Sequence, residues 1–291
     1  MQSVPTARNL AFGAIILFTG YWGTVSPSWA VQASAQGTKS VLAAHRAVYD
    51  MKLGDAEGQS GVAGLKGRMV YDFTGNACDG YSVNFRFVTQ FQDANGGSQI
   101  TDLQTTSFEE PGAQSYQFLS KTYVDDKLVE SSRGTASLGA NDKTVELKEP
   151  SEKSLEIGLD VQFPTEHLLT ILGSAHAGEH FIATDIFDGA ETGDKVYATT
   201  TVIGAMSVVE EENVTGKPNQ GLAGHTYWPV TVAYFDPTAE KVTGEQTPVY
   251  QLSFWLLENG ISDRLVLDYG DFTLTGTMSD LELYKPETCD D

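Results

Sequence analysis

The feature that most constrains this chain is an alternation of apolar and polar side chains along much of its length. In segment 81–91 all but one of the odd-numbered positions are apolar, and polar residues fill most of the positions between them. Segments 47–53 and 65–73 show the same pattern. Successive side chains of a β-strand point to opposite faces, so a period of two predicts strands with one buried and one exposed face. Such strands are typical of antiparallel sheets.

Weaker alternation predicts ten further strands. They are 98–108, 115–124, 128–138, 143–148, 180–187, 194–203, 224–235, 248–258, 262–269 and 271–284. Asn259-Gly260 predicts a hairpin with a type I′ turn, because both of its central positions need left-handed backbone. The polar segments 149–162 and 210–223 are predicted to be surface loops. About thirteen strands with short turns favour a β-protein, either a large sandwich or a barrel.

One stretch breaks the alternation and predicts a helix over 164–177. Its apolar residues recur at helical spacing: Leu168, Leu169, Ile171, Leu172 and Ala175. Pro164 suits the first helical turn, and Gly178 suits the residue after the last turn. We expect a single amphipathic helix that packs its leucine face against the inner wall of an otherwise open barrel.

The first 35 residues are predicted to be a secretion signal. Arg8 supplies the positive charge, an apolar run follows from Leu10, and small residues permit cleavage after Ala30 or Ala35. An uncleaved anchor is the alternative, although glycines and a proline interrupt the run. The prediction is therefore a cleavable signal over 1–35 and a single exported domain over 36–291.

Cys78 and Cys289 are the only cysteines of the chain. An exported protein meets an oxidising compartment, so a disulfide between them is the default prediction, and two unpaired buried thiols are the alternative. The bridge would join two positions 211 residues apart. That span favours one closed unit over two independent domains.

The charge balance excludes one class of function. Eighteen basic and 39 acidic side chains give a net charge of −21. Nucleic acids and anionic membranes attract a basic face, so no nucleic-acid partner is expected.

Two motifs could hold a metal ion. His176, Glu179 and His180 match the H-x-x-E-H pattern of zinc proteases, but Gly178 stands inside the motif and would end the helix that must align the histidines. A metal-dependent hydrolase is therefore the alternative function. The acidic residues of segment 185–194 could bind calcium, while a hairpin tip with solvated carboxylates explains them more simply. These acids are Asp185, Asp188, Glu191 and Asp194.

No nucleophile elbow, phosphate-binding glycine loop or dinucleotide fingerprint is found, so neither catalytic residues nor a cofactor are predicted. Segments 227–235 and 249–257 are apolar at both odd and even positions. Such strands lie between two packed layers, or they face the core on one side and a ligand on the other. On the second interpretation, Trp228, Tyr250, Phe254 and Trp255 line a pocket.

An ordered set of short motifs resembles the EipB-like family of bacterial cell-envelope proteins. The matching segments are 45–49, 67–71, 78–81, 163–167, 188–189, 228–230, 248–250, 258–260, 268–272 and Cys289. The resemblance implies an incompletely closed, spiral-like antiparallel β-barrel in the periplasm, stapled by a Cys78–Cys289 disulfide. It also implies a part in envelope maintenance and stress resistance without catalysis, and an architecture similar to that of periplasmic lipoprotein carriers.

These observations lead to one preferred hypothesis. The protein is expected to be a non-enzymatic periplasmic factor that binds a lipid or another amphipathic envelope component, or a periplasmic or outer-membrane protein partner.

Overall fold

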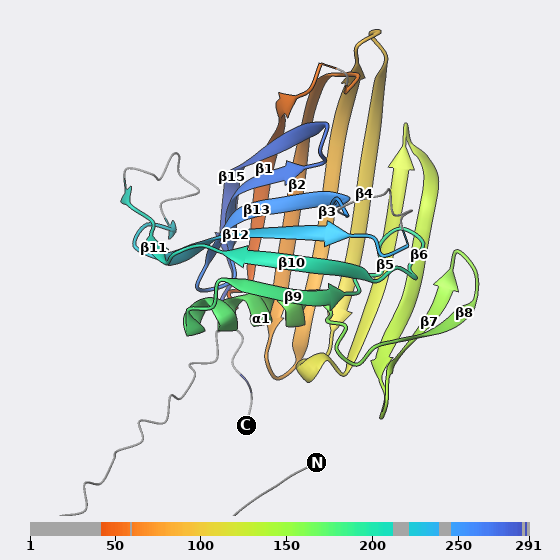
Figure 1. Ribbon diagram of the computed structural model, residues 1–291, viewed down its shortest axis with the longest axis vertical. Helices are drawn as coiled ribbons and strands as arrows, with labels where there is room; N and C mark the ends of the chain where they lie inside the picture. The colour runs from red at the N-terminus through yellow and green to blue at the C-terminus, as the bar shows by residue number, and fades with distance from the viewer. Residues whose placement is uncertain (1–41, 59, 212–220, 239–245, 287–288, 290–291) are drawn as a thin grey trace, which may run out of the picture. The chain divides into compact units, whose positions relative to one another are not determined.

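The computed structural model describes residues 42–58, 60–211, 221–238, 246–286 and 289 (Figure 1). They belong to one compact unit, Lys39–Asp291. The predicted secretion signal lies outside the described residues, and so does most of the predicted loop 210–223. Within the described ranges, no helix is both long enough and apolar enough to cross a bilayer.

The described residues form one antiparallel sheet of fifteen strands, a 3-10 turn and one α-helix. The strands are β1 (His45–Ala56), β2 (Val62–Asn76), β3 (Gly80–Asp93), β4 (Ser98–Glu109), β5 (Ser115–Val124), β6 (Lys127–Leu138), β7 (Lys143–Glu149), β8 (Lys153–Ile157), β9 (Phe181–Ile186), β10 (Tyr197–Ile203), β11 (Ser207–Val208), β12 (Thr226–Phe235), β13 (Tyr250–Leu257), β14 (Ser262–Asp268) and β15 (Phe272–Leu283). The 3-10 turn η1 spans Pro111–Ala113, and the helix α1 spans Pro164–Ala177. The prediction of a β-protein with one helix is confirmed.

The order of the strands explains why the barrel is open. Along the sheet the order is β8-β7-β6-β5-β4-β3-β2-β1-β15-β14-β13-β12-β10-β9, with β11 paired to β12. Thus the first strand pairs with the last in the middle of the sheet, while β8 and β9, neighbours in sequence, form its two edges. The sheet curls so that β9, β10, β12 and β13 cross in front of β2–β4 (Figure 1). This arrangement confirms the predicted incompletely closed barrel.

Helix α1 and the segment before it link the two edges of the sheet. Lys143 of β7 donates hydrogen bonds to the carbonyl of Val161 and to Glu166 of α1. Gln162 forms an isolated parallel bridge with Ile186 of β9. The chain between β8 and β9 therefore bonds to both sides of the opening, which explains how an unclosed sheet keeps its edges in place.

The ends of α1 follow the sequence rules. Pro164 takes the first turn, and the Phe163 amide donates to the Glu166 side chain at 3.3 Å. Gly178 adopts φ +76°, and its N–H donates to the carbonyl of Ala175. Of the predicted apolar face, Ile171, Leu172 and Ala175 are buried and Leu168 is half-buried. Leu169 is 36% exposed, so the predicted leucine face is narrower than expected.

The strand register assigns each side chain to one face. Residues directly opposite each other in a ladder share a face, so Tyr71 of β2, Phe85 of β3 and Thr105 of β4 all point inward. The inward face holds two core clusters. One surrounds Ile171 and Leu172 of α1, and the other packs Tyr116 and Phe118 of β5 against Phe163 and Phe187.

A disulfide joins Cys78, in the turn between β2 and β3, to Cys289 in the tail, with the two Cα atoms 5.7 Å apart. The predicted pairing is confirmed. Because β1 and β15 also pair along their length, the two ends of the domain are held by both a covalent bond and a ladder.

Two local predictions are wrong, and one short strand was missed. The segment 149–162 was expected to be a loop, yet it contains β8, whose polar side chains hid a strand that pairs only with β7. The two-residue strand β11 was also not predicted. At the β13–β14 hairpin only Gly260 has positive φ, at 86°, so the turn is not type I′. A bond from the Gly260 amide to the Leu257 carbonyl closes the turn instead, with Gly260 in the left-handed position that follows it.

Candidate functional site

Five aromatic side chains form a continuous row on the inward face, which we call the aromatic ladder. Its members are Tyr197, Tyr234, Tyr250, Tyr269 and Phe272. Successive ring centroids are 6.3, 4.4, 6.1 and 5.2 Å apart, so each ring contacts the next across β10, β12, β13 and the β14–β15 turn. Burial raises the pKa of Tyr234 and Tyr250 above the ordinary value of 10, which keeps both hydroxyls protonated.

Beyond the ladder, the inward face of β2 and β3, together with Leu103 of β4, is also largely apolar but not fully covered. The register places five half-buried apolar side chains there: Leu65, Phe85, Phe87, Phe91 and Leu103. Large apolar residues at the ends of the same strands nearest α1, such as Phe73 and Tyr81, are buried. Burial of the inward face therefore increases toward the helix, and solvent reaches the apolar side chains at the other end.

Glu109 of β4 attaches α1 to the sheet. Its two carboxyl oxygens accept hydrogen bonds from the amides of Thr165 and Glu166 at 2.8 and 2.9 Å. These amides belong to the first helical turn, where N–H groups lack partners within the helix. Burial raises the pKa of Glu109 to about 7, against the lowering effect of the two amide bonds.

His167 of α1 lies in the core beside this attachment. It is 4% exposed, and its Nε2 atom has no hydrogen-bond partner among the described residues. Burial lowers its pKa to about 4, because the charged imidazolium would lose hydration without gaining a partner.

The four residues predicted to line a pocket do not converge. Trp228 and Phe254 point inward and are buried in the core cluster, and Tyr250 belongs to the aromatic ladder. Trp255 lies on the opposite face, where it stacks on Tyr227 at 4.0 Å. Alternation along β13 requires this, because neighbouring residues of a strand face opposite ways. Their role in ligand binding stays a prediction.

The sequence-based metal motif has a different geometry from a metal centre. His176 packs edge-on against Trp228 at 4.8 Å, Glu179 accepts a bond from Ser174, and the His180 ring bonds to the carbonyl of Ile203. Since the helix ends at Ala177, the two histidines do not share a helical face. Across the described part of the chain, no group of three or more histidine, cysteine or acidic residues could hold a metal ion.

The acidic loop 185–194 is folded onto the sheet, and this corrects the expectation of a solvated hairpin tip. Ser132 donates to the Gly189 carbonyl at 2.6 Å, and Tyr116 donates to the Asp188 carbonyl at 3.0 Å. Gly189 has φ +68°, and a side chain there would collide with the Phe118 ring. The carboxylates have separate partners, since Asp194 pairs with Lys153 and Glu191 with Lys195.

Sequence reasoning missed most of the aromatic ladder. Tyr197, Tyr269 and Phe272 stand at strand ends in three different segments, where each resembles an ordinary core residue. Only the pairing of β10 with β12, and of β13 with both β12 and β14, brings the rings into one row.

The fold and this inward face define a class of protein: an open, β-barrel-like sheet whose edges are linked through a single helix and whose inward face is partly uncovered. The chain belongs to the EipB-like family, whose family model matches residues 36–285. It is similar to the cell envelope integrity protein EipB of Brucella abortus (strain 2308), with 39% identity over 286 residues that cover 98% of this chain and 96% of the relative.

A solved structure agrees with this assignment. The crystal structure of a β-barrel-like protein from Brucella abortus is similar to this chain, with a TM-score of 0.77 and 40% sequence identity. The match covers 84% of this chain and 99% of that one.

Proposed function

We propose that this protein maintains the integrity of the cell envelope from the periplasm, without catalysing a reaction. The name of the Brucella relative, cell envelope integrity protein, supports the role. The disulfide supports an oxidising compartment such as the periplasm. Metal-dependent hydrolysis is not proposed, because the residues of the sequence motif each have another partner.

The mechanism that we propose is binding of the apolar part of an amphipathic envelope component on the inward face. The observation that carries this proposal is the incomplete burial of inward-pointing aromatic and aliphatic residues at the end away from α1. Covering apolar surface stabilises a complex by about 25 cal/mol per Å². An acyl chain laid along this face would remove such surface from water.

The aromatic ladder suits an amphipathic ligand better than a wholly apolar one. Tyrosine combines an apolar ring with a hydroxyl that needs a polar partner, and four of the five ladder residues are tyrosines. The Tyr197 hydroxyl already donates to Glu191 at 2.6 Å, and Tyr234 and Tyr250 stack on each other. The ring edges would therefore contact the chain of the ligand, and the hydroxyl of the exposed Tyr269 would contact its polar group.

Lipid extraction of the purified protein, followed by mass spectrometry, tests the proposal directly. Binding of the fluorescent probe N-phenylnaphthylamine supplies an affinity for variants. Tyr250→Ser should weaken probe binding about tenfold, since a buried aromatic contact of 1–2 kcal/mol is lost. Tyr123→Ser is the matched control, because Tyr123 lies on the outward face of β5. No extracted lipid together with equal probe affinity in both variants would refute the inward-face mechanism.

A protein partner is the second candidate, and a different surface favours it. Phe181 of β9 and Val202 of β10 are direct cross-strand neighbours, 62% and 53% exposed, and nearby Met206 is 67% exposed. Exposed apolar residues that cluster in this way mark interaction sites. Phe181→Ser should abolish a partner-dependent cross-link in envelope extracts while leaving lipid extraction unchanged. A cross-link that persists in this variant would rule out the Phe181 surface.

A further inference from the structure

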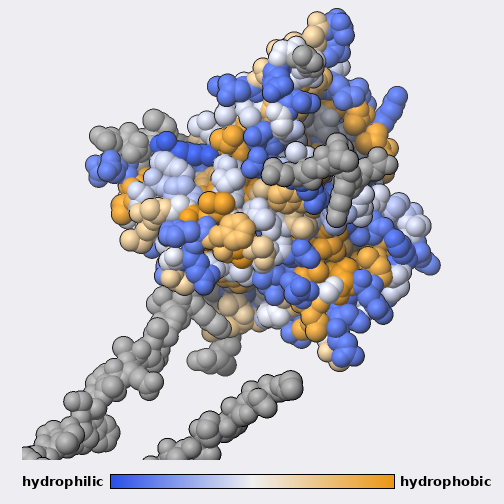
Figure 2. Space-filling model, viewed as in Figure 1, coloured by the Kyte–Doolittle hydropathy of each residue, from blue (hydrophilic) through white to orange (hydrophobic). Residues whose placement is uncertain are grey.

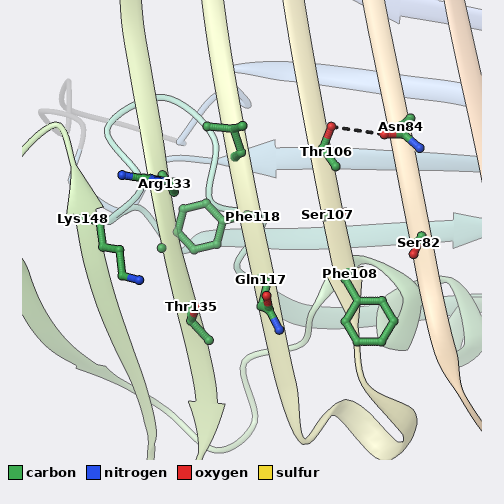
Figure 3. A pocket seen from close by; sticks show the side chains of 12 residues that line it. Ser82, Asn84, Thr106, Ser107, Phe108, Gln117, Phe118, Arg133, Thr135 and Lys148 are labelled. Atoms are coloured by element: carbon green, nitrogen blue, oxygen red, sulfur yellow. Dashed lines mark hydrogen bonds between the residues drawn. The ribbon is translucent and has the colours of Figure 1, made fainter.

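The outward face of β3–β7 contains a cavity of about 380 Å³. We call it the outer groove. It is lined by side chains from five neighbouring strands, including Asn84, Phe108, Gln117, Arg133, Thr135 and Lys148 (Figure 3). In β5 the groove residue Gln117 alternates with the core residues Tyr116 and Phe118, which places the groove on the face opposite the aromatic ladder.

The dimensions of the outer groove match a small organic ligand rather than a single ion. Neighbouring strands lie about 4.8 Å apart, so four spacings from β3 to β7 extend the lining over about 19 Å. Small-molecule sites in proteins occupy about 300–1,000 Å³. A ligand of two or three linked rings fits both measures.

The lining lacks acidic residues, although the chain as a whole is strongly acidic. None of the twelve lining residues is aspartate or glutamate, and two are cationic. Arg133 is paired with Glu149 at 2.9 Å, just outside the lining. Lys148 is exposed and makes no ion pair or side-chain hydrogen bond with the described residues. The groove therefore contains one positive charge that has no ion-pair partner among the described residues, in a chain of net charge −21.

A β-bulge accounts for the position of this lysine. In the β6–β7 ladder Arg133 faces Glu149 and Gly134 faces Leu147, which leaves Lys148 without an opposite residue. A bulge of this kind redirects side chains and is common beside binding sites. Here the bulge brings Lys148 and Glu149 to the same face. Glu149 pairs with Arg133, and the ammonium of Lys148 remains available to a ligand.

The remaining lining consists of neutral hydrogen-bonding side chains, Gly134 and three large apolar residues, Phe108, Phe118 and Leu119. Gln117 and Thr135 make no side-chain hydrogen bond with the described residues, and Thr106 donates to Asn84 at 3.2 Å. The half-buried Phe108 ring lies over Gly80, where the missing side chain leaves room for it. Amide and hydroxyl groups match the alternating donors and acceptors of sugar hydroxyls, and an aromatic ring matches the apolar face of a sugar.

We propose that the outer groove binds an acidic saccharide of two or three residues, with its anionic group on Lys148 and a sugar ring against Phe108. A phospholipid fits less well, because Phe108, Phe118 and Leu119 are the only large apolar residues among the twelve. The site is independent of the proposed inward-face function, since it lies on the other face of the sheet.

The test uses trigalacturonic acid, its neutral counterpart maltotriose and inorganic phosphate as probes of the purified protein. Calorimetry gives affinities, and amide chemical shifts show where each probe binds. We expect trigalacturonic acid to shift the amides of β4–β6 and to bind about tenfold more weakly to Lys148→Gln, because a charge-assisted hydrogen bond is lost. Lys127→Gln is the matched control, an exposed lysine at the start of β6 outside the groove.

Three outcomes would overturn the proposal. They are no shift of the β4–β6 amides at saturating trigalacturonic acid, equal affinity of Lys148→Gln and Lys127→Gln, and phosphate binding that displaces the saccharide with the same shifts. Equal binding of maltotriose would refute the assignment of an anionic group. Because both substitutions are at exposed positions, far-ultraviolet circular dichroism should be unchanged in both variants.

Discussion

At the scale of single residues, the Lys143 ion pair illustrates how burial affects the contribution of an ion pair to folding stability. Its side chain is 3% exposed, it donates to the Val161 carbonyl and to Glu166, and its ammonium lies 4.4 Å from the centroid of the Phe163 ring. A buried cation with these partners links β7 to the segment before α1. The exposed pair of Lys153 with Asp194 has a shorter ion-pair distance, 2.6 Å, but both groups can reach water. The ion-pair distance alone would therefore assign the larger contribution to stability to the exposed pair, whereas burial assigns it to the pair of Lys143.

Removing each lysine should separate the two cases. Lys143→Ala should lower the free energy of unfolding by about 3 kcal/mol, because it leaves a buried carbonyl and part of a carboxylate without a partner. Lys153→Ala should cost less than about 1 kcal/mol, since exposed pairs contribute little. Urea unfolding of the two variants provides the comparison. Equal losses would show that burial at Lys143 does not matter.

At the scale of elements, the contact between α1 and β4 contains two buried ionisable groups with opposite effects on stability: His167 of α1, and Glu109 of β4, which accepts hydrogen bonds from α1. Glu109, which receives the first helical amides, has its pKa raised from 4.5 to about 7 by burial. The folded state then holds the proton more tightly, so stability from this group falls as pH rises from 4.5 to 7. His167 has its pKa lowered from 6.5 to about 4 by burial. The unfolded state then binds more protons, so stability from this group falls as pH drops from 6.5 to 4.

Single variants should reveal these opposed slopes. Each shift is equivalent to about 3 kcal/mol across its window. Relative to the parent protein, Glu109→Gln should lose stability at low pH more than at neutral pH, while His167→Gln should gain relative stability as pH falls below 6. Urea unfolding at half-unit steps between pH 4 and 8 measures both differences. Parallel profiles for the three proteins would contradict the assignment of these groups.

At the scale of the whole domain, the meeting of β1 and β15 organises the fold. Two meanders run outward from this central pair and end at the edges β8 and β9, which the chain around α1 links. The disulfide adds a covalent link between the same two ends of the domain, across 211 residues. The β1–β15 pairing and the disulfide therefore both hold the two ends of the domain together.

Removing the disulfide should lower stability without changing the fold. Closing a loop of this length is worth up to about 5 kcal/mol in the entropy of the unfolded chain, and residual structure reduces that value. The double variant Cys78→Ser, Cys289→Ser should therefore unfold at lower urea concentration while its circular dichroism stays unchanged, because β1 and β15 remain paired. An unchanged urea midpoint would show that the β1–β15 pairing alone holds the two ends of the domain together.

The parts of this fold that depend on local rules could be predicted from the sequence. Alternation located nearly all the strands, and Pro164 and Gly178 marked the ends of the helix within a residue. The prediction failed where local signals were weak or ambiguous. In β8 only Leu155 and Ile157 alternate with polar residues, a pattern too short to distinguish a strand from a polar loop. The loop at Gly189 resembled a solvated turn because nothing in its sequence shows that Phe118 covers it.

Local patterns in the sequence were sufficient to predict which residues share a strand face, where the helix begins and ends, and which two cysteines could pair. Each of these properties depends on neighbours within a few residues or, for the cysteines, on there being only two. Which strands are adjacent, and which face is partly uncovered, depends on contacts between segments far apart in the chain. Ring contacts such as Tyr234–Tyr250, and the outer groove across β3–β7, arise from pairing between segments, and alternation within one segment carries no information about its partner.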